Sequence, residues 1–387
     1  MKVGVTVASF QTTDWPRVKA EEWSAPIKVP DSQVVGETRE LGKMIEPLGY
    51  DSIWVGEHFG SPYGMWPDAT QTLSYWAGQT ERVDMGSNVI VLPWHQPLTL
   101  AHRIAMLDNM LEGRRFHLGV GRGVARCEFE ALGVPRAEAR ERFKETWEII
   151  KLALTNERIS YDGKHFKIPE TSVRPRPLHD DMVDFAACAS TTQTSMEMAA
   201  HEGFSQLFVT GAPLNEMSKV IDDYNAIRAG EGLEPDQPTV LLWMYCAKTE
   251  DEAQRALQWF TTYGDEVATH YEFNKPGAFD GVKGYEAYAD MQAKVVEDEQ
   301  KNGAARQGTS LVRFDTQPIG TPETIIERLR ILQRETGAKE IALLPQFGGM
   351  SLSEAKASMK LFAEEVMPVI QADPAPAREA PVPIAGE

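Results

Sequence analysis

The stretch MGSNVIVLPWHQPLTLAHRIAMLDNMLEGRRFHLGVGRG, residues 85–123, contains two short apolar runs with a longer segment between them. The first run, Met85–Leu92, barely alternates with polar residues, which is typical of a strand covered on both faces in a parallel sheet. Pro97 suits the first turn of a helix, and the large apolar residues after it recur every three or four positions as far as Leu111. The second run is Phe116–Val120. The stretch therefore predicts a strand, a helix and a parallel strand.

The same alternation continues in both directions along the chain. Short runs rich in β-branched and apolar residues are the strand candidates: Val3–Phe10, Ser52–Glu57, Met85–Leu92, Phe116–Val120, Val183–Cys188, Gln206–Val209, Val240–Ala247 and Glu340–Leu344. Segments with helical spacing separate these runs. Eight parallel strands that alternate with helices predict an α/β fold, the (β/α)8 TIM barrel.

Two segments are longer than a minimal barrel needs. Glu157–Arg176 contains an Asp-Gly turn between short extended pieces, and predicts a hairpin before the fifth strand. Thr249–Pro318, between the last two strands, has helical portions and predicts a lid over the barrel mouth. We expect one domain over residues 1–371. Residues 372–387 combine proline, alanine and charge without periodicity, and predict a disordered tail.

Composition narrows the classes of function. The 387 residues carry 39 basic and 57 acidic side chains, and the net charge of −18 disfavours nucleic acid and membrane surfaces as partners. Three widely spaced cysteines fit neither a disulfide framework nor a cysteine metal cluster. No apolar run approaches the roughly 20 residues that cross a bilayer, and the first residues do not resemble a secretory signal. We therefore expect a cytoplasmic protein.

Glu57 and His58 follow the second predicted strand. In a barrel of this kind, reactive groups lie where the strands end and the loops begin. An imidazole exchanges protons near neutral pH, and an adjacent carboxylate can tune it. The pair is thus a candidate for acid–base catalysis. The alternative is a histidine that only ties its loop to neighbouring segments.

Asn88 stands in the middle of the third predicted strand. A buried amide is costly unless its polar atoms find partners. Asn88 therefore indicates a bulge or a ligand contact, unless the backbone satisfies its amide.

A glycine-rich turn follows the fourth predicted strand, with glycines at 119, 121 and 123 around Arg122. The glycines give a flat or charged ligand access to the backbone, and Arg122 supplies a permanent cation. The turn does not match the dinucleotide-binding fingerprint, because the last glycine of that motif would fall on Val124. The alternative role for Arg122 is an ion pair with a nearby carboxylate.

Hydroxyl side chains crowd the helix start after the fifth predicted strand, at Ser190, Thr191, Thr192, Thr194 and Ser195. Capping of the helix explains one or two of them. The others, together with the free amides and the positive end of the helix dipole, predict a phosphate cradle that Arg122 closes from the other side. No histidine or cysteine spacing suits a metal, and we predict no metal site.

Taken together, these motifs resemble the bacterial luciferase-like family of flavin-dependent monooxygenases. The matches occur in the family's order and approximate spacing: GYDSIWVGEHF at 49–59, residues 86–123, EFEALGV at 128–134, ASTTQTSMEMAA at 189–200, PIGTPETI at 318–325 and LFAEEVMP at 361–368. The resemblance covers nearly the whole chain, from Met1 to about Ile370.

The resemblance implies reduced FMN bound at the carboxyl ends of the barrel strands. His58 matches the family's histidine beside the flavin, which donates or accepts a proton, and Glu57 matches the carboxylate before it. Asn88–Val89 matches a position where relatives carry a non-prolyl cis peptide against the flavin ring. Two departures make light emission unexpected: luciferase has a second histidine in place of Phe59, and a reactive cysteine in place of Gly121.

The same resemblance implies which residues bind the phosphate end of the flavin. Arg122 matches the phosphate-binding arginine, and Thr192 and Ser195 match the hydroxyls that share the phosphate with it. Ser190 and Thr191 remain rival assignments for these hydroxyls.

The leading hypothesis from the sequence is a two-component monooxygenase. A separate flavin reductase would supply reduced FMN, O₂ would react through a flavin C4a-(hydro)peroxide, and one oxygen atom would pass to a small organic substrate. No NAD(P)H-binding motif is visible, which agrees with an external source of electrons. One alternative is a deazaflavin-dependent oxidoreductase that transfers hydride, and another is a non-catalytic flavin-binding subunit. The family implies a dimer, and we expect a homodimer. The substrate class stays open.

Overall fold

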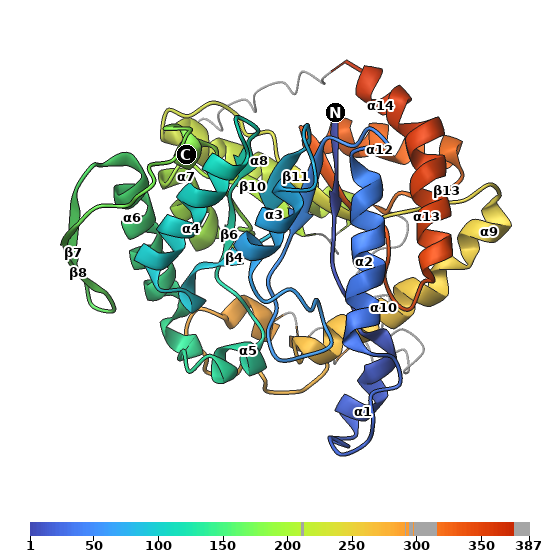
Figure 1. Ribbon diagram of the computed structural model, residues 1–387, viewed down its shortest axis with the longest axis horizontal. Coiled ribbons are helices and arrows are strands. Elements are labelled where there is room, and N and C mark those ends of the chain that lie inside the picture. The colour runs from blue at the N-terminus through green and yellow to red at the C-terminus, as the bar shows by residue number, and fades with distance from the viewer. Residues whose placement is uncertain (210–212, 291, 294–296, 298–315, 375–387) are drawn as a thin grey trace.

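The structure is a computed structural model of the 387-residue chain, and it describes residues 1–209, 213–290, 292–293, 297 and 316–374 (Figure 1). A sheet of parallel strands forms its centre. These strands are β1 Lys2–Thr6, β2 Ser52–Val55, β3 Asp84–Ser87, β4 Ile90–Val91, β5 Phe116–His117, β6 Gly119–Gly121, β9 Ala187–Cys188, β10 Ser205–Val209, β11 Thr239–Trp243 and β14 Glu340–Leu344.

The strand pairings close this sheet into a barrel. The third barrel strand consists of β3 and β4, and the fourth consists of β5 and β6; β3 pairs with β5, and β4 pairs with β6. From β6 the pairing passes through β9, β10 and β11 to β14, then through β1 and β2 back to β3. The predicted (β/α)8 barrel is therefore confirmed.

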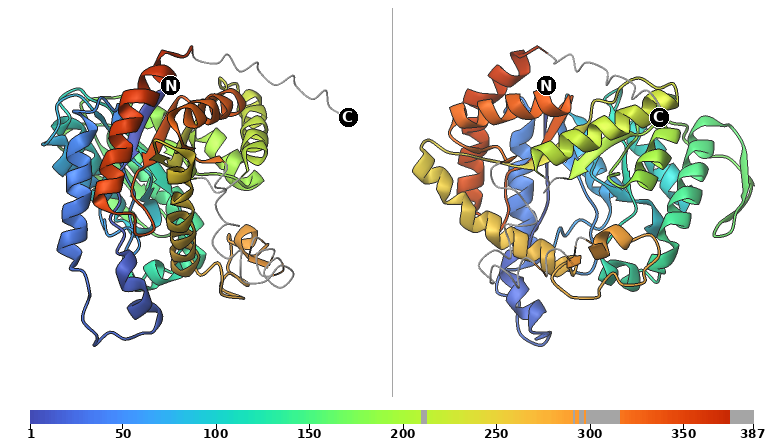
Figure 2. Two further views of the ribbon diagram at one scale, coloured as in Figure 1. Left: turned by 90° about the vertical axis from the view of Figure 1, so that its right-hand side faces the viewer. Right: turned by 180° about the vertical axis from the view of Figure 1, so that it is seen from behind.

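Helices surround the barrel (Figures 1 and 2). They are α1 Trp15–Lys19, α2 Asp31–Ile45, α3 Ala69–Ala77, α4 Pro97–Met110, α5 Arg126–Ala131, α6 Ala139–Thr155, α7 Gln193–His201, α8 Leu214–Gly230, α9 Glu250–Gln254, α10 Ala256–His270, α12 Pro322–Thr336, α13 Leu352–Leu361 and α14 Met367–Ala372. Their ends follow ordinary capping chemistry: the Asp68 side chain accepts the Gln71 N–H at the start of α3, and α12 stops at Gly337, whose φ is 68°. Within the described residues, no helix has the length and apolar character needed to cross a bilayer.

Several predicted strands are shorter than expected, and the first, Val3–Phe10, already ends at Thr6. Of Val183–Cys188, only Ala187–Cys188 is a strand, because the chain before it winds into the 3₁₀ turn Met182–Phe185. Val240–Ala247 divides after Trp243. Its end, β12 (Tyr245–Cys246), leaves the barrel and pairs with β13 (Ile319–Gly320) in a separate two-stranded sheet.

Trp54 fills the interior of the barrel. Its fully buried ring packs against Ala187, Leu207 and Ala342, which come from strands on other sides of the barrel. A Cβ atom on Gly86 of the neighbouring strand would lie 2.4 Å from the indole ring. Small residues around one large ring thus produce a solid core rather than a pore.

Both predicted insertions are present. The first is the antiparallel hairpin of β7 (Ile159–Asp162) and β8 (Lys167–Thr171), which projects from one side of the barrel in Figure 1. The second lies between β11 and β14 and contributes α9, α10 and the segment 271–290. In Figure 1, α10 lies at the bottom with α5, opposite the N-terminus. Of the predicted tail, residues 375–387 lie outside the described residues.

Candidate active site

The predicted site residues come from segments at one end of the barrel. His58 and Glu57 follow β2, Asn88–Val89 joins β3 to β4, Arg122 follows β6, and the hydroxyl residues lie between β9 and α7. Because every barrel strand runs in the same direction, these segments gather at the carboxyl end. The distances below decide what each side chain can do there.

The peptide bond between Asn88 and Val89 is cis. The Asn88 backbone N–H donates to the Val55 carbonyl at 2.9 Å, and the side-chain Nδ2 donates to Thr6 Oγ1 at 2.9 Å. Asn88 Oδ1 is buried and has no hydrogen-bond partner among the residues that the structure describes. The amide is therefore half satisfied, and an unpaired acceptor of this kind indicates a ligand contact.

Glycines flank this peptide unit on both sides. A Cβ atom on Gly56 would lie 3.0 Å from the Asn88 carbonyl oxygen, and one on Gly121 would lie 2.5 Å from Val89 Cγ2. Larger residues would displace the Asn88–Val89 unit from its neighbours. Gly121 is thus required here for packing against Val89.

Glu57 is buried and faces the framework of the barrel mouth. Its Oε2 accepts the Val91 N–H at 2.9 Å and lies 2.9 Å from His95 Nε2, while Oε1 accepts the Ala69 N–H at 3.3 Å. Burial opposes protonation of the His95 ring, but the Glu57 carboxylate outweighs it and raises the pKa of His95. These bonds give Glu57 a structural task, which is to fix the loop that carries His58.

His58 contacts two residues that the sequence did not single out, Glu128 and His270. His58 Nδ1 lies 2.9 Å from Glu128 Oε1, which also accepts the Phe59 N–H at 3.0 Å. His270 Nε2 approaches the same oxygen at 3.4 Å, and its Nδ1 lies 2.9 Å from Ser61 Oγ. Glu128 and His270 have side chains that are 1% and 0% exposed, whereas the His58 side chain is 21% exposed. The imidazole of His58 thus joins a buried polar cluster to the barrel mouth.

The same three residues are the described group best placed to hold a metal ion. Their ligand atoms lie within 4.8 Å of one another. The 2.9 Å separation of His58 Nδ1 from Glu128 Oε1 is a hydrogen bond, and His270 Nε2 lies 3.4 Å from the same oxygen. The cluster therefore fits a hydrogen-bonded chain better than a metal centre.

Aromatic rings line the His58 side of the mouth. The ring of Tyr63 lies 4.7 Å from the His58 ring and 4.6 Å from the His270 ring. Its hydroxyl contacts the Tyr263 hydroxyl at 2.6 Å, and Phe10 packs against both tyrosines. Tyr263 and His270 belong to α10, so the insertion supplies part of this wall.

Arg122 contacts the insertion from the opposite side. Its Nη1 donates to the Gly284 carbonyl at 2.6 Å, and its guanidinium lies 4.2 Å from the centre of the Tyr285 ring. The Tyr285 hydroxyl donates to the Gly123 carbonyl at 2.9 Å, which fastens the same segment to the glycine-rich turn. Among the described residues, Arg122 thus contacts a carbonyl and a ring, and the ion pair with a carboxylate that was the alternative role for Arg122 does not form.

The hydroxyl-rich turn divides into capping and packing roles. Thr192 is the N-cap of α7 and forms a reciprocal capping box with Ser195. Ser190 is buried, and its hydroxyl accepts the Gln206 amide at 2.7 Å. Thr191 is exposed. The structure thus keeps Thr192 and Ser195 at the helix start, where the phosphate assignment needs them, and gives Ser190 a different partner.

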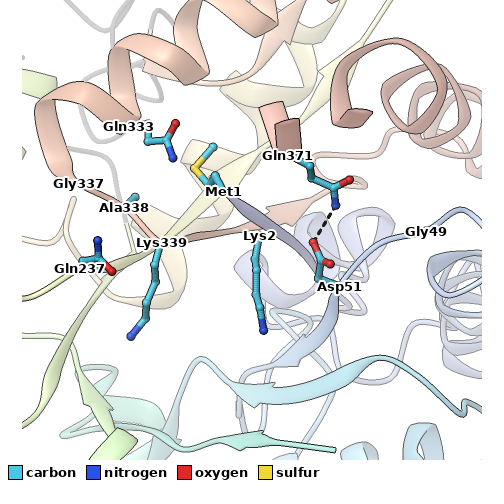
Figure 3. Close-up of a pocket in the computed structure, with 10 residues that line it drawn as sticks. All are labelled: Met1, Lys2, Gly49, Asp51, Gln237, Gln333, Gly337, Ala338, Lys339 and Gln371. Atoms are coloured by element: carbon cyan, nitrogen blue, oxygen red, sulfur yellow. Dashed lines mark hydrogen bonds between the residues drawn. The ribbon is translucent and has the colours of Figure 1, made fainter. Parts of the chain in front are cut away.

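A separate hollow of about 530 Å³ lies at the opposite end of the barrel (Figure 3). Lys2, Lys339 and Asp51, which precede or begin barrel strands, line it, and Gln371 donates to Asp51 at 2.9 Å. Residues at the amino ends of barrel strands generally serve stability. None of the residues that line this hollow is a predicted site residue.

A sequence model described as luciferase-like monooxygenase matches residues 5–340 of the chain. The chain belongs to the luciferase-like monooxygenase family. It is 24% identical over 354 residues to the alkanal monooxygenase alpha chain of a Kryptophanaron alfredi symbiont, across 89% of this chain and 96% of that relative. The predicted resemblance, and with it a monooxygenase enzyme at the level of the family, is confirmed.

Solved structures share the fold of this luciferase-like protein. One is the oxygenating constituent of 3,6-diketocamphane monooxygenase from the CAM plasmid of Pseudomonas putida, in complex with FMN. It has a TM-score of 0.71 and 19% identity, and the likeness covers 95% of this chain and 98% of that one. Another is an F420-dependent secondary alcohol dehydrogenase, with a TM-score of 0.66, 14% identity and coverage of 94% and 98%. At these sequence identities, the similarity establishes the barrel fold alone. The cofactor has to be inferred from the residues of the site.

Proposed function

We propose that this protein is the oxygenating component of a two-component monooxygenase, which binds reduced FMN and O₂ and inserts one oxygen atom into a small organic substrate. The proposal rests mainly on Asn88 Oδ1, a buried and unpaired acceptor at the position where the family places the flavin ring. It lies at the end of the barrel that also carries the His58 imidazole and the Arg122 guanidinium. A flat ligand with N–H donors and an anionic tail would satisfy all three groups.

The residues present fit FMN at both of its ends. Glycines at positions 56 and 121 let the backbone pack closely against the Asn88–Val89 unit and hold it in place, and Asn88 Oδ1, without a partner among the described residues, would face the N–H groups of a planar ring. For the phosphate, Thr192 and Ser195 would contribute hydroxyls at the helix start, and Arg122 would contribute its guanidinium. A guanidinium has five N–H donors, so Arg122 can hold the Gly284 carbonyl and still bind a phosphate oxygen.

When bound, reduced FMN supplies the electrons that activate O₂. The protein would hold the ring against Asn88–Val89 and keep water away with the aromatic wall of Tyr63 and Tyr263. His58 would hold or move a proton at its Nε2 atom. Glu57 would fix the His58 loop through its backbone hydrogen bonds, as a positioning rather than a reacting group.

The proposal extends to the partners. A separate flavin reductase would supply the reduced cofactor, because the sequence contains no NAD(P)H-binding motif. We propose that the protein acts in the cytoplasm as a homodimer, which analytical ultracentrifugation of the purified protein would test. A single species at the mass of one 43.1 kDa chain would refute the dimer. Of the predicted lid Thr249–Pro318, residues 291, 294–296 and 298–315 lie outside the described residues; we propose that the described part, which carries His270 and Tyr285, covers the barrel mouth.

An anaerobic titration with reduced FMN tests the cofactor assignment. We expect saturable binding of reduced FMN, and weaker binding by Arg122→Ala. A hydrogen bond to a charged group contributes about 1.5–3 kcal/mol, which corresponds to a loss of roughly 10- to 100-fold in affinity. Reduced riboflavin lacks the phosphate, so its affinity should not change. The matched control is Arg330→Ala, whose guanidinium pairs with Asp373 at the end of α14.

Two outcomes would contradict the assignment. One is that FMN binds in neither redox form. The other is that Arg122→Ala loses affinity for riboflavin and for FMN by the same factor. The likeness to an F420-dependent dehydrogenase keeps hydride transfer from a deazaflavin as the second candidate. Tighter binding of reduced F420 than of reduced FMN would favour it. Oxygen uptake that yields only H₂O₂ with every substrate class would favour a non-catalytic flavin-binding protein.

A further inference from the structure

Glu128 is a carboxylate buried at the start of α5, with its Oε1 atom directed at the His58 loop. It accepts the backbone N–H of Phe59 at 3.0 Å and lies 2.9 Å from His58 Nδ1. A carboxylate accepts hydrogen bonds and cannot donate them while it is ionised. The proton of this short contact therefore belongs to His58 Nδ1.

The tautomer of the second histidine follows from its own neighbours. Ser61 Oγ accepts the Tyr63 N–H at 3.1 Å and lies 2.9 Å from His270 Nδ1. If Ser61 donates its proton to Nδ1, the His270 proton is on Nε2, which lies 3.4 Å from Glu128 Oε1 but forms no hydrogen bond to it. The opposite tautomer would direct a nitrogen lone pair at the carboxylate. The contacts of Ser61 are thus consistent with a His270 proton on Nε2.

The charges of the cluster support this arrangement. Burial alone would raise the pKa of Glu128, but the neighbouring His58 and His270 outweigh it and lower that pKa to about 2, so the carboxylate is ionised at neutral pH. Burial lowers the pKa of His270 and keeps its ring neutral. Tyr63 and Tyr271, whose rings also face His58, have pKa values raised by burial and are neutral as well. Of the four residues Glu128, His270, Tyr63 and Tyr271 around His58, only Glu128 is therefore ionised.

We propose that Glu128 is a positioning residue that holds His58 as its Nδ1–H tautomer, with the buried ring of His270 from the insertion packed beside the same carboxylate. The lone pair of the neutral His58 ring is then on Nε2, the nitrogen on the side of the ring away from Glu128. A carboxylate on one nitrogen orients an imidazole and stabilises the imidazolium that forms when the other nitrogen takes a proton. The catalytic meaning of this arrangement rests on the proposed function, whereas the hydrogen bonds themselves require no flavin.

Nitrogen-15 NMR of histidine-labelled protein without flavin tests the inference. The two tautomers of a neutral imidazole have different nitrogen shifts, and His58→Gln and His270→Gln assign the signals. We expect His58 as Nδ1–H and His270 as Nε2–H in the same spectrum. Glu128→Leu removes the acceptor and should lose the Nδ1–H signal of His58, while Glu128→Asp should retain it. Glu130→Leu is the matched control, because Glu130 lies on the same helix with a side chain that is 61% exposed.

The wild-type spectrum alone can overturn the proposal, even if Glu128→Leu fails to fold. His58 observed as Nε2–H in the wild-type protein would refute it, as would an unchanged His58 tautomer in folded Glu128→Leu. Because no cofactor is added, failure of the protein to bind FMN would leave this result untouched. A negative tautomer result would likewise leave the flavin titration unaffected, so the two proposals fail separately.

Discussion

Glu266 is a buried acid on α10 whose ionisation should weaken the folded protein. The residue is 2% exposed, and neither carboxylate oxygen has a hydrogen-bond partner among the described residues. Burial raises its pKa from 4.5 to about 7, although Thr12 and Lys19 nearby partly oppose the shift. Because the pKa is higher in the folded state than in the unfolded state, the contribution of Glu266 to stability is full below pH 4.5. It is lost as the pH rises through about 7.

The size of this loss follows from the shift. A difference of one pKa unit corresponds to about 1.4 kcal/mol, so Glu266 should lower the free energy of unfolding by about 3 kcal/mol at pH 8 relative to pH 4.5. Glu266→Gln cannot ionise. We expect this variant to match the parent protein near pH 4.5, to gain stability relative to it as the pH rises from 5 to 7, and to keep that gain above pH 7.

Thermal unfolding of the two proteins from pH 5 to pH 9 measures the effect. A gain of this size should raise the unfolding midpoint by several degrees at pH 8. The control is Asp265→Asn, which alters a neighbouring carboxylate that is 48% exposed and paired with Lys19. A difference between Glu266→Gln and the parent that does not change with pH would refute the reasoning.

Two further predictions concern packing and a buried ion pair. Gly42→Ala should lower the free energy of unfolding by roughly 1–3 kcal/mol, because its Cβ would lie 2.1 Å from the Trp76 ring. The Cβ of Gly36→Ala, on the same helix, meets no atom within 4 Å. This variant should raise the free energy of unfolding by up to about 1 kcal/mol. Urea unfolding of both variants checks this pair, and a similar sign for both would contradict it. His95→Phe leaves the buried Glu57 carboxylate without its imidazole, and should cost about 3–5 kcal/mol below pH 6. Because the pKa of His95 is raised, this cost should shrink as the pH rises and the parent's imidazole loses its proton. His201→Phe, at a side chain that is 75% exposed, is the control, and a cost that grows with pH would count against the ion pair.

The sequence predicted the barrel and the order of its parts because both depend on local patterns. Apolar runs without alternation located the strands, and an Asp-Gly pair located the β7–β8 hairpin. Asn88 in the middle of the run Met85–Leu92 indicated an irregularity or a ligand contact there, but the pattern did not show that the third strand divides into two at Asn88–Val89. Likewise, the winding of Met182–Phe185 into a 3₁₀ turn is decided by the surrounding structure rather than by the residues themselves.

The sequence predicted the candidate site less completely than the fold. Strand-end position and family motif identified His58, and its exposure at the barrel mouth agrees with that choice. Its partners were missed because Glu128 is 70 residues away along the chain, and His270 lies in an insertion without a recognisable motif. The EFEALGV motif did contain Glu128, and this was the one signal that could have led to it. Glu57 was found at the right position, but only the three-dimensional direction of its carboxylate reveals that it binds backbone amides.

The insertion between β11 and β14 has a consequence for protein engineering. Its helix α10 delivers His270 and Tyr263 to the mouth, while Gly284 and Tyr285 meet Arg122 on the far side. Replacing the whole insertion with that of a homologue would therefore also exchange groups around the acid–base and anion-binding candidates. A chimera designed to alter substrate choice should keep α10 and these two anchor residues. It can vary the exposed residues 274–276 between them instead.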